Sequence, residues 1–191
     1  MRTAEFPVTD EVMGELLDLT EQIEKGVKWG RIPHSEAMEL LRGLNERYSV
    51  EAATLDFDAD PHIPDGWSVR PEDQIASRLT GSWELDISKI GLHLDTSQQG
   101  DKFIEGYELK KQLEGQKVLP AHVLDELLEH PELIPESFKD KSIFFWGTIY
   151  RGSDGMLCVR YLGWYSGGWY WDNYWLGSGW EDHEPCAVLA I

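Results

Sequence analysis

Cysteine and basic residues are both scarce in this chain of 191 residues. The two cysteines, Cys158 and Cys186, form no CxxC pair, so the sequence contains no disulfide framework. Lys and Arg number 17 against 35 Asp and Glu, which gives a formal net charge of −18. A protein with this balance repels nucleic acid and anionic membranes. We therefore expect no direct contact with either.

Long apolar runs are also missing. No stretch approaches the length of a membrane span, and the first residues, MRTAEFPVTDEV, lack the apolar core of a signal peptide. Because the two thiols are also expected to be reduced, these absences predict a soluble, cytoplasmic protein. Hydrophobic residues at 41% and aromatic residues at 12% still supply enough apolar surface for a folded core.

The first part of the chain has a helical period. Apolar residues recur at helical spacing over residues 10–28 and again over residues 35–48, with a short break between them. This pattern predicts an N-terminal α-helical hairpin in a region spanning residues 1–55. The Asp- and Pro-rich sequence DFDADPHIPDGW then opens a connecting segment, residues 56–82, with a short helix expected from Pro71.

Residues 83–191 combine helical and strand patterns. Helices are expected over residues 106–113 and from Pro120, and after Ser142 the apolar period changes to two. The stretches with strand character are SIFFWGTIYR, MLCVRYLGWY, WYWDNYWL and the final AVLAI. The predicted fold class is therefore α+β, an N-terminal helical hairpin followed by a small C-terminal antiparallel sheet of three or four strands packed on helices.

The stretch GWYSGGWYWDNYWLGSGW, residues 163–180, gathers five tryptophans and three tyrosines. In a strand, alternate side chains face opposite sides, and we expect one side to stay partly exposed. One side would carry Trp169, Trp171, Asn173 and Trp175, and the other would carry Tyr170, Asp172, Tyr174 and Leu176.

Three interpretations of these rings stay open. They can pair across strands and stabilise the sheet, anchor a protein partner, or stack on a carbohydrate or another uncharged ligand. Arg160 is expected to stack on a ring or to pair with a buried acid such as Asp172. The candidate binding residues are Trp169, Trp171, Trp175, Asn173, Asp172 and Arg160.

Three sequence motifs precede the Trp-rich tail. They are LDELL (Leu124–Leu128), HPELIPE (His130–Glu136) and FWGTIYR (Phe145–Arg151). This combination resembles an uncharacterised bacterial family with an LDxLL, HPxLIPE and FWGTIYR pattern and a Trp-rich C-terminal region. The resemblance covers roughly the C-terminal half of the chain. It implies a domain boundary before that region and assigns no catalytic residue.

Patterns typical of catalysis or metal binding are absent from the sequence. EDHEPC brings His183 and Cys186 close along the chain, but short spacing does not supply the geometry of a Cys-His pair, and the neighbouring acids raise the thiol pKa. There is no HExxH, no Gly-rich phosphate loop and no GxSxG. We expect no enzyme activity, no metal and no cofactor.

The leading functional prediction is a non-enzymatic, acidic protein–protein interaction module. Its partner would present a basic surface, and in the sharpest version the chain is an inhibitor, from a phage or other mobile element, that occupies a nucleic-acid-binding surface. The alternative is a carbohydrate or small-molecule binding module that uses the Trp-rich face. The sequence leaves the oligomeric state open. The expected acidic face consists of Asp10, Glu11, Glu15, Asp18, Glu21 and Glu24.

Overall fold

A computed structural model describes residues 10–40, 53–100 and 102–190, with side chains from residue 18 onward. The chain divides into two compact units, Met1–Ala52 and Ala53–Ile191. Within the described ranges, no helix combines the length and the apolar character needed to cross a membrane.

In the first unit, helix α1 runs over Asp10–Lys28, as its apolar period predicts. The chain leaves the helix at Gly30, whose φ is +67°, a left-handed conformation that commonly closes helices and suits glycine. Residues 34–40 are again helical. The rest of the second predicted helix, and with it the predicted hairpin, lies outside the described residues.

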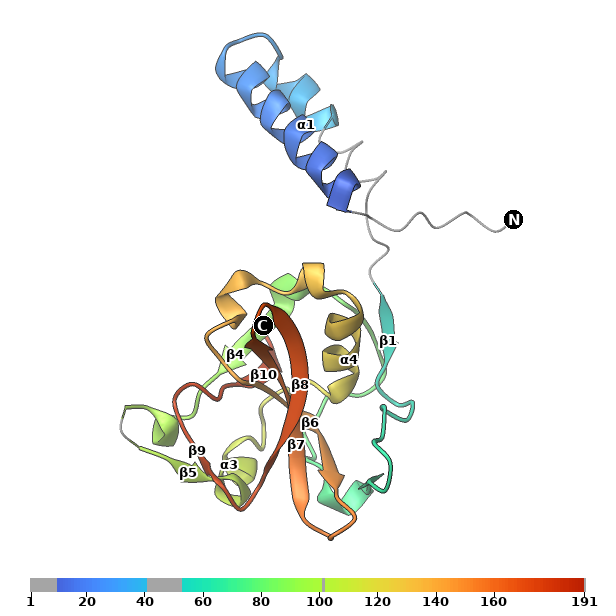
Figure 1. Ribbon diagram of the computed structural model, residues 1–191, viewed down its shortest axis with the longest axis vertical. Helices are drawn as coiled ribbons and strands as arrows, with labels where there is room; N and C mark the ends of the chain where they lie inside the picture. The colour runs from blue at the N-terminus through green and yellow to red at the C-terminus, as the bar shows by residue number, and fades with distance from the viewer. Residues whose placement is uncertain (1–9, 41–52, 101, 191) are drawn as a thin grey trace, which may run out of the picture. The chain divides into compact units, whose positions relative to one another are not determined.

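The second unit is built on a six-stranded sheet, and the fold class is α+β (Figure 1). Five strands lie in the order β4-β10-β6-β7-β8, and β2 also pairs with β6. Their bounds are Ser68–Val69 (β2), Ile90–His93 (β4), Ile143–Arg151 (β6), Leu157–Tyr165 (β7), Gly168–Trp175 (β8) and Cys186–Leu189 (β10).

This sheet is larger than the predicted meander. Strands β6, β7 and β8 form the expected antiparallel meander, but β10 returns to the far side of β6 and runs parallel to it. There it also pairs with β4 in the antiparallel sense. The apolar C-terminal strand thereby lies inside the sheet, where both of its backbone edges find partners.

Shorter elements surround the sheet. Two small antiparallel pairs join β1 (Thr54–Asp56) to β3 (Ser82–Glu84) and β5 (Ile104–Glu105) to β9 (Gly179–Trp180). The α-helices of this unit are α3 (Gly106–Gln112) and α4 (Ala121–Glu129). The 3-10 helices are η1 (Pro71–Asp73), η2 (Ile87–Lys89), η3 (Thr96–Gln98), η4 (Pro131–Leu133) and η5 (Glu136–Phe138).

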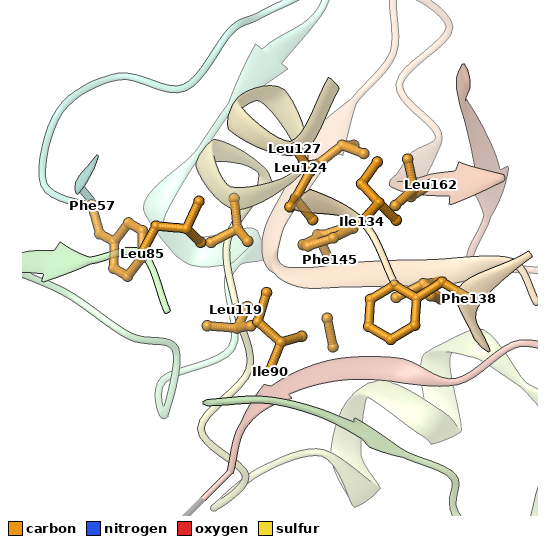
Figure 2. Packing of buried hydrophobic residues seen from close by; sticks show 13 residues of the cluster. Phe57, Leu85, Ile90, Leu119, Leu124, Leu127, Ile134, Phe138, Phe145 and Leu162 are labelled. Atoms are coloured by element: carbon orange, nitrogen blue, oxygen red, sulfur yellow. The ribbon is translucent and has the colours of Figure 1, made fainter. Parts of the chain in front are cut away.

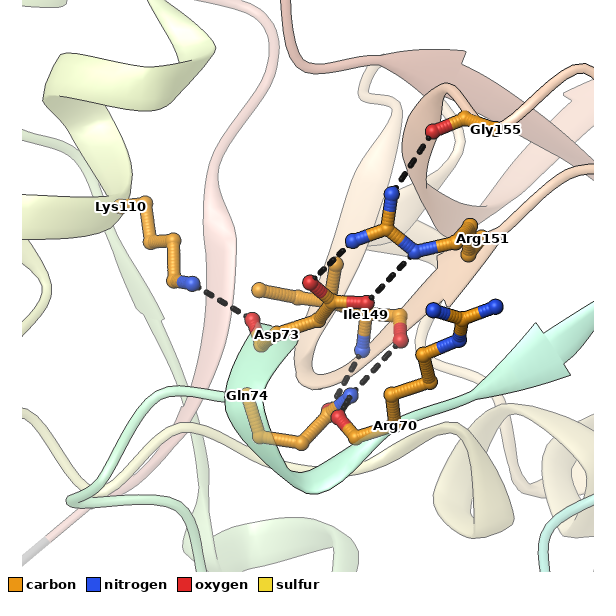
Figure 3. Close-up of polar contacts among 7 residues, drawn as sticks. All are labelled: Arg70, Asp73, Gln74, Lys110, Ile149, Arg151 and Gly155. Carbon is orange, nitrogen blue, oxygen red and sulfur yellow. Dashed lines mark hydrogen bonds and ion pairs between the residues drawn. The ribbon is translucent and has the colours of Figure 1, made fainter.

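The predicted connecting segment, residues 56–82, belongs to the second unit. The helix expected from Pro71 is only the three-residue η1. It stops because the Gln74 carboxamide donates to the Ile149 carbonyl and accepts from the Ile149 amide, both at 2.8 Å. The chain therefore leaves the helical path at Gln74 to contact strand β6 (Figure 3).

A charged contact holds the same segment in place. Asp73 is buried, and its carboxylate accepts hydrogen bonds from Arg151 of β6, the Nε bond measuring 3.0 Å. Lys110 of α3 donates to the Asp73 carbonyl (Figure 3). These bonds join η1, β6 and α3, so Asp73 and Arg151 have a structural role.

Alternate residues of β6 enter two cores on opposite faces of the sheet. Ile143 and Phe145 of β6 pack with Leu162 of β7 against α4, and we call this cluster the α4 core. Figure 2 shows Phe145 and Leu162 beside Leu124 and Leu127 of the helix. Phe144 and Trp146 pack in the second cluster, the α3 core. Further members of the α4 core are Val123, Leu124, Leu127, Ile134 and Phe138, and those of the α3 core include Leu109, Leu113, Ile149 and Trp180.

Both faces of the central strands are therefore covered. The expectation that one side of the aromatic strand stays partly exposed is confirmed for the side of Trp171 and Trp175. The central strands differ, because α4 covers one of their faces and α3 with β9 covers the other. The exposed rings of the sheet lie on both sides of its edge strand, β8, and at the end of β7.

Candidate functional site

Strand β8 carries a group of exposed aromatic side chains. It is the last strand of the sheet and, among the described strands, pairs only with β7. Trp171 and Trp175 on one side are 37% and 44% exposed, and Tyr170 on the other side is 39% exposed. Tyr165, at the end of β7, is 78% exposed. Neighbouring exposed rings of this size are typical of binding surfaces.

Trp171 is held in place by a buried arginine. The guanidinium carbon of Arg160 lies 4.1 Å from the centroid of the Trp171 ring, and Arg160 is only 1% exposed. Its Nη2 donates to Asp125 Oδ1 of α4 at 2.7 Å. Burial lowers the pKa of Arg160, but hydrogen bonds with Asp125 and Tyr150 outweigh burial and raise it. The arginine therefore stays charged and fixes the ring above it.

The acid that pairs with Arg160 is not Asp172, the residue suggested by the sequence. The register places Asn173 opposite Arg160, so Asp172 faces the other side of the sheet. Its Oδ1 accepts the backbone N–H of Asn173 at 2.7 Å instead. The sequence did not point to Asp125, although this residue is the aspartate of the LDELL motif, because it lies on a separate helix.

Trp169 is less available than the other two tryptophans of its side. It is half-buried against the α4 core, and its ring meets Trp164 edge-on with centroids 5.0 Å apart. The Lys139 ammonium lies 4.1 Å from the Trp164 centroid on the same side. Of the three tryptophans predicted for the site, Trp171 and Trp175 present the open ring surface.

The opposite side of β8 carries tyrosines. The Tyr170 ring lies over Gly163, where an added Cβ would come 2.8 Å from the ring. Burial, followed by a hydrogen bond with Tyr170, raises the pKa of Tyr161, so this phenol stays neutral. A shallow, open depression of about 370 Å³ lies at the end of the hairpin, lined by Tyr165, Gly168, Trp169 and Tyr170.

Negative charge predominates around the aromatic strand, since Lys139, the cation beside Trp164, is paired with Glu136. Helix α4 packs against β8 and contains Asp125, Glu126 and Glu129 without any Lys or Arg. No Lys or Arg occurs over residues 161–180. The buried Arg160 is neutralised by Asp125. The surface around the rings therefore favours a cationic partner over an anionic one.

The acidic face predicted on α1 is partly neutralised. Asp18, Glu21 and Glu24 are exposed, but Glu21 pairs with Lys25 at 2.6 Å, and Lys28 follows in the last turn. Outside the described side chains lie Asp10, Glu11 and Glu15.

The cysteine chemistry considered for EDHEPC lacks an accessible nucleophile. Cys186 is 2% exposed, and burial raises the pKa of its thiol. Its Sγ contacts the Ala187 carbonyl at 3.4 Å, whereas His183 is exposed beside Glu181 and Asp182. Burial also raises the pKa of Cys158 to about 12. Among the described residues, no group of three or more His, Cys, Asp or Glu side chains could hold a metal ion.

His122 makes the stability of the fold dependent on pH. Its Nε2 lies 3.1 Å from the Ala59 carbonyl, and its buried Nδ1 has no hydrogen-bond partner among the described residues. Burial lowers the pKa of this imidazole, so the neutral form is favoured in the folded state. The neutral His122 imidazole contributes fully to stability when the pH lies above about 6.5, the pKa of histidine in the unfolded chain. This contribution falls as the pH drops below that value, because the unfolded state then binds the proton more readily.

We expect the His122→Gln variant to lose less stability than the wild type between about pH 7.5 and about pH 5.5. Glutamine can still donate to Ala59 but cannot titrate, while all other groups remain. Urea midpoints at both pH values measure the difference. Equal losses in the two proteins would show that His122 is not responsible.

Comparisons with family models, with curated proteins and with solved structures find no match for this chain. The family resemblance therefore stays a prediction. The structure places two of its motifs in regular elements. LDELL supplies Leu124, Leu127 and the Asp125 carboxylate to α4, and FWGTIYR forms residues 145–151 of β6, which are buried up to Tyr150.

Proposed function

We propose that this chain is a non-enzymatic protein-binding module whose partner presents a basic surface. The observation that supports it best is Trp171, an exposed ring on an edge strand that Arg160 and Asp125 already hold in one position. Tryptophan is enriched among residues that dominate binding energy, and a fixed ring loses less entropy on binding. The net charge of −18 would speed the encounter with a basic partner.

In its sharper form, the proposal makes the chain an inhibitor. The partner's basic surface would be one that holds DNA or RNA, and the acidic chain would occupy it. The proposal places the protein in the cytoplasm, where its two free thiols stay reduced. In this proposal, α4 and β8 make the main contact with the partner, and the acidic residues of α1 add electrostatic attraction.

Affinity capture from a bacterial lysate tests the proposal with three baits of equal net charge. They are the wild type, Trp171→Ala/Trp175→Ala and Trp29→Ala. Trp29 is a matched control because it is also an exposed tryptophan beside an arginine. It is 64% exposed, and the Arg31 guanidinium carbon lies 5.2 Å from its ring centroid. It is far from β8 in sequence.

We expect a discrete basic protein to be retained by the wild type and by Trp29→Ala. The double variant should bind it roughly thirtyfold more weakly, the effect of losing about 2 kcal/mol of anchoring energy. Retention should also fall between about 0.1 M and about 1 M salt. Identical capture by all three baits would contradict the proposal, because only net charge would then matter.

Displacement from DNA–cellulose tests the inhibitor form. Lysate proteins are loaded on the resin, and each bait is added as the eluent. Release of one DNA-binding protein by the wild type and Trp29→Ala, but not by the double variant, supports inhibition. If a captured partner stays on DNA, the module binds proteins without this inhibitory role.

The depression at Tyr165, Gly168, Trp169 and Tyr170 favours a second candidate, carbohydrate binding. Aromatic rings beside an open hollow can stack on sugar rings, and Trp169 would report the contact through its fluorescence. A glycan panel titrated against the wild type tests this candidate. A saturable change lost in Tyr165→Ala would support it, and a panel without any response would exclude it for the sugars tried.

A further inference from the structure

The backbone of β8 leaves one hydrogen-bonding edge open. The Leu176 amide donates to the Leu157 carbonyl at 2.9 Å, which fixes the phase of the β7–β8 ladder. Because hydrogen-bonded pairs alternate in antiparallel sheets, even-numbered residues of β8 bond to β7. The amides and carbonyls of the odd-numbered residues therefore point away from the sheet, and these belong to Trp169, Trp171, Asn173 and Trp175.

The second half of this edge is partly occupied. The Asn173 amide donates to the Asp172 carboxylate at 2.7 Å, and the Trp175 carbonyl accepts from the Ser178 amide at 3.0 Å. In the described part of the chain, no hydrogen bond is found for the outward amides and carbonyls of Trp169 and Trp171. A short extended segment has four backbone groups to pair with there, two donors and two acceptors.

The charges beside this edge select the occupant. Helix α4, which packs against β8, contributes Glu126 and Glu129, and Asp172 lies on the other side of the strand. Two nearby charges are already paired, Asp125 with Arg160 and Lys139 with Glu136. A second copy of a chain with net charge −18 would bring like charges together. Lysine or arginine side chains would instead meet carboxylates and the outer surface of Trp171, whose inner surface Arg160 already contacts.

We propose that β8 binds its partner by strand addition, pairing the Trp169–Trp171 edge with an extended segment that carries lysine or arginine at every second position. This inference rests on the proposed function and names its binding mode. Main-chain hydrogen bonds would supply affinity, and alternate side chains would supply selectivity. Asp172 limits the added strand by capping the next outward amide.

A random-peptide phage library, selected on the full-length protein, tests the binding mode. We expect enriched peptides to carry Lys or Arg at alternate positions and to be lost on the Trp171→Ala/Trp175→Ala bait. The best peptide is then N-methylated at one residue at a time, which removes one backbone donor without changing charge. In an added strand, only alternate peptide N–H groups point toward β8. A single methyl group on one of these nitrogens should weaken binding at least about tenfold, whereas a methyl group on an intervening nitrogen should have little effect.

The methyl scan leaves the protein untouched, so its result does not depend on the folding of a variant. An absence of enrichment over the double-variant bait, or a scan without a two-residue period, would overturn strand addition. If the protein partner still depends on Trp171 in affinity capture, the proposed function survives and only its binding mode is wrong.

Two substitutions at Asp172 isolate the capped amide. Asp172→Asn removes the charge and keeps a side-chain oxygen that can accept the Asn173 amide, whereas Asp172→Ala removes both. We expect Asp172→Ala to bind the selected peptide about two- to tenfold more tightly than Asp172→Asn, since one more backbone donor becomes free. Equal affinity would show that the added strand does not reach Asn173, contrary to the limiting role assigned to Asp172.

Discussion

Replacing Asp125 with alanine is expected to destabilise the second unit more than replacing Arg160 with methionine, although the two residues form one ion pair. The Arg160 side chain is 1% exposed and that of Asp125 is 27% exposed. Asp125→Ala leaves a charged guanidinium buried with Tyr150, at a cost of about 3–5 kcal/mol. Arg160→Met leaves a carboxylate that reaches water, at a cost of about 1–2 kcal/mol.

Urea unfolding followed by tryptophan fluorescence measures both effects, because Trp29 is the only tryptophan before residue 53. With a slope of about 2 kcal/mol per molar urea, the midpoint should fall by about 2 M for Asp125→Ala and by less than about 1 M for Arg160→Met. The double variant should be more stable than Asp125→Ala alone. The reverse order of the single variants would contradict a buried, permanently charged Arg160.

A methyl group at Gly147 is expected to cost about 2–4 kcal/mol of unfolding free energy. An added Cβ would lie 2.6 Å from the Pro120 nitrogen and 2.7 Å from the Leu119 carbonyl carbon. Both are backbone atoms, so no side-chain rotation can relieve the clash. The Gly147 amide also donates to the Leu119 carbonyl at 2.9 Å, and separating the two segments would lose this bond.

Gly168→Ala is the matched control for Gly147→Ala. Both glycines lie in strands of the same sheet, but an added Cβ at Gly168 meets nothing within 4 Å. We expect its urea midpoint to stay within about 0.3 M of the wild type. A similar loss in both variants would mean that the effect reflects glycine in a strand and not the approach of Leu119 and Pro120.

Local patterns predicted the longer helices and strands of the second unit. The period of two located β6, β7 and β8, and the helix expected over residues 106–113 is found as Gly106–Gln112. These elements follow from side chains close together in sequence. The position of β10 between β4 and β6 does not, because the choice of a partner strand depends on residues far apart along the chain.

The same limit applies to the candidate site. Alternation correctly placed Trp169, Trp171 and Trp175 on one side of a strand. It could not reveal that α4 would cover the neighbouring strands, nor that the strand with the exposed rings would lie at the edge of the sheet. The sequence suggested Asp172 as the acid beside Arg160, but the structure shows Asp125 there. Alternation along a strand could not predict this contact, because Asp125 lies on helix α4.

The central position of β10 determines when the sheet can be completed during synthesis. Ribosomes release the N-terminal part of a chain first, so β4 and β6 emerge while β10 is still missing. In that interval β4 has no partner among the described strands, and the side of the nine-residue β6 that later meets β10 is unpaired. Pairing across this long sequence separation is slow. The nascent chain therefore passes through a stage in which β6, a strand that becomes almost wholly buried, can pair with another molecule, and release of residues 186–189 ends that stage.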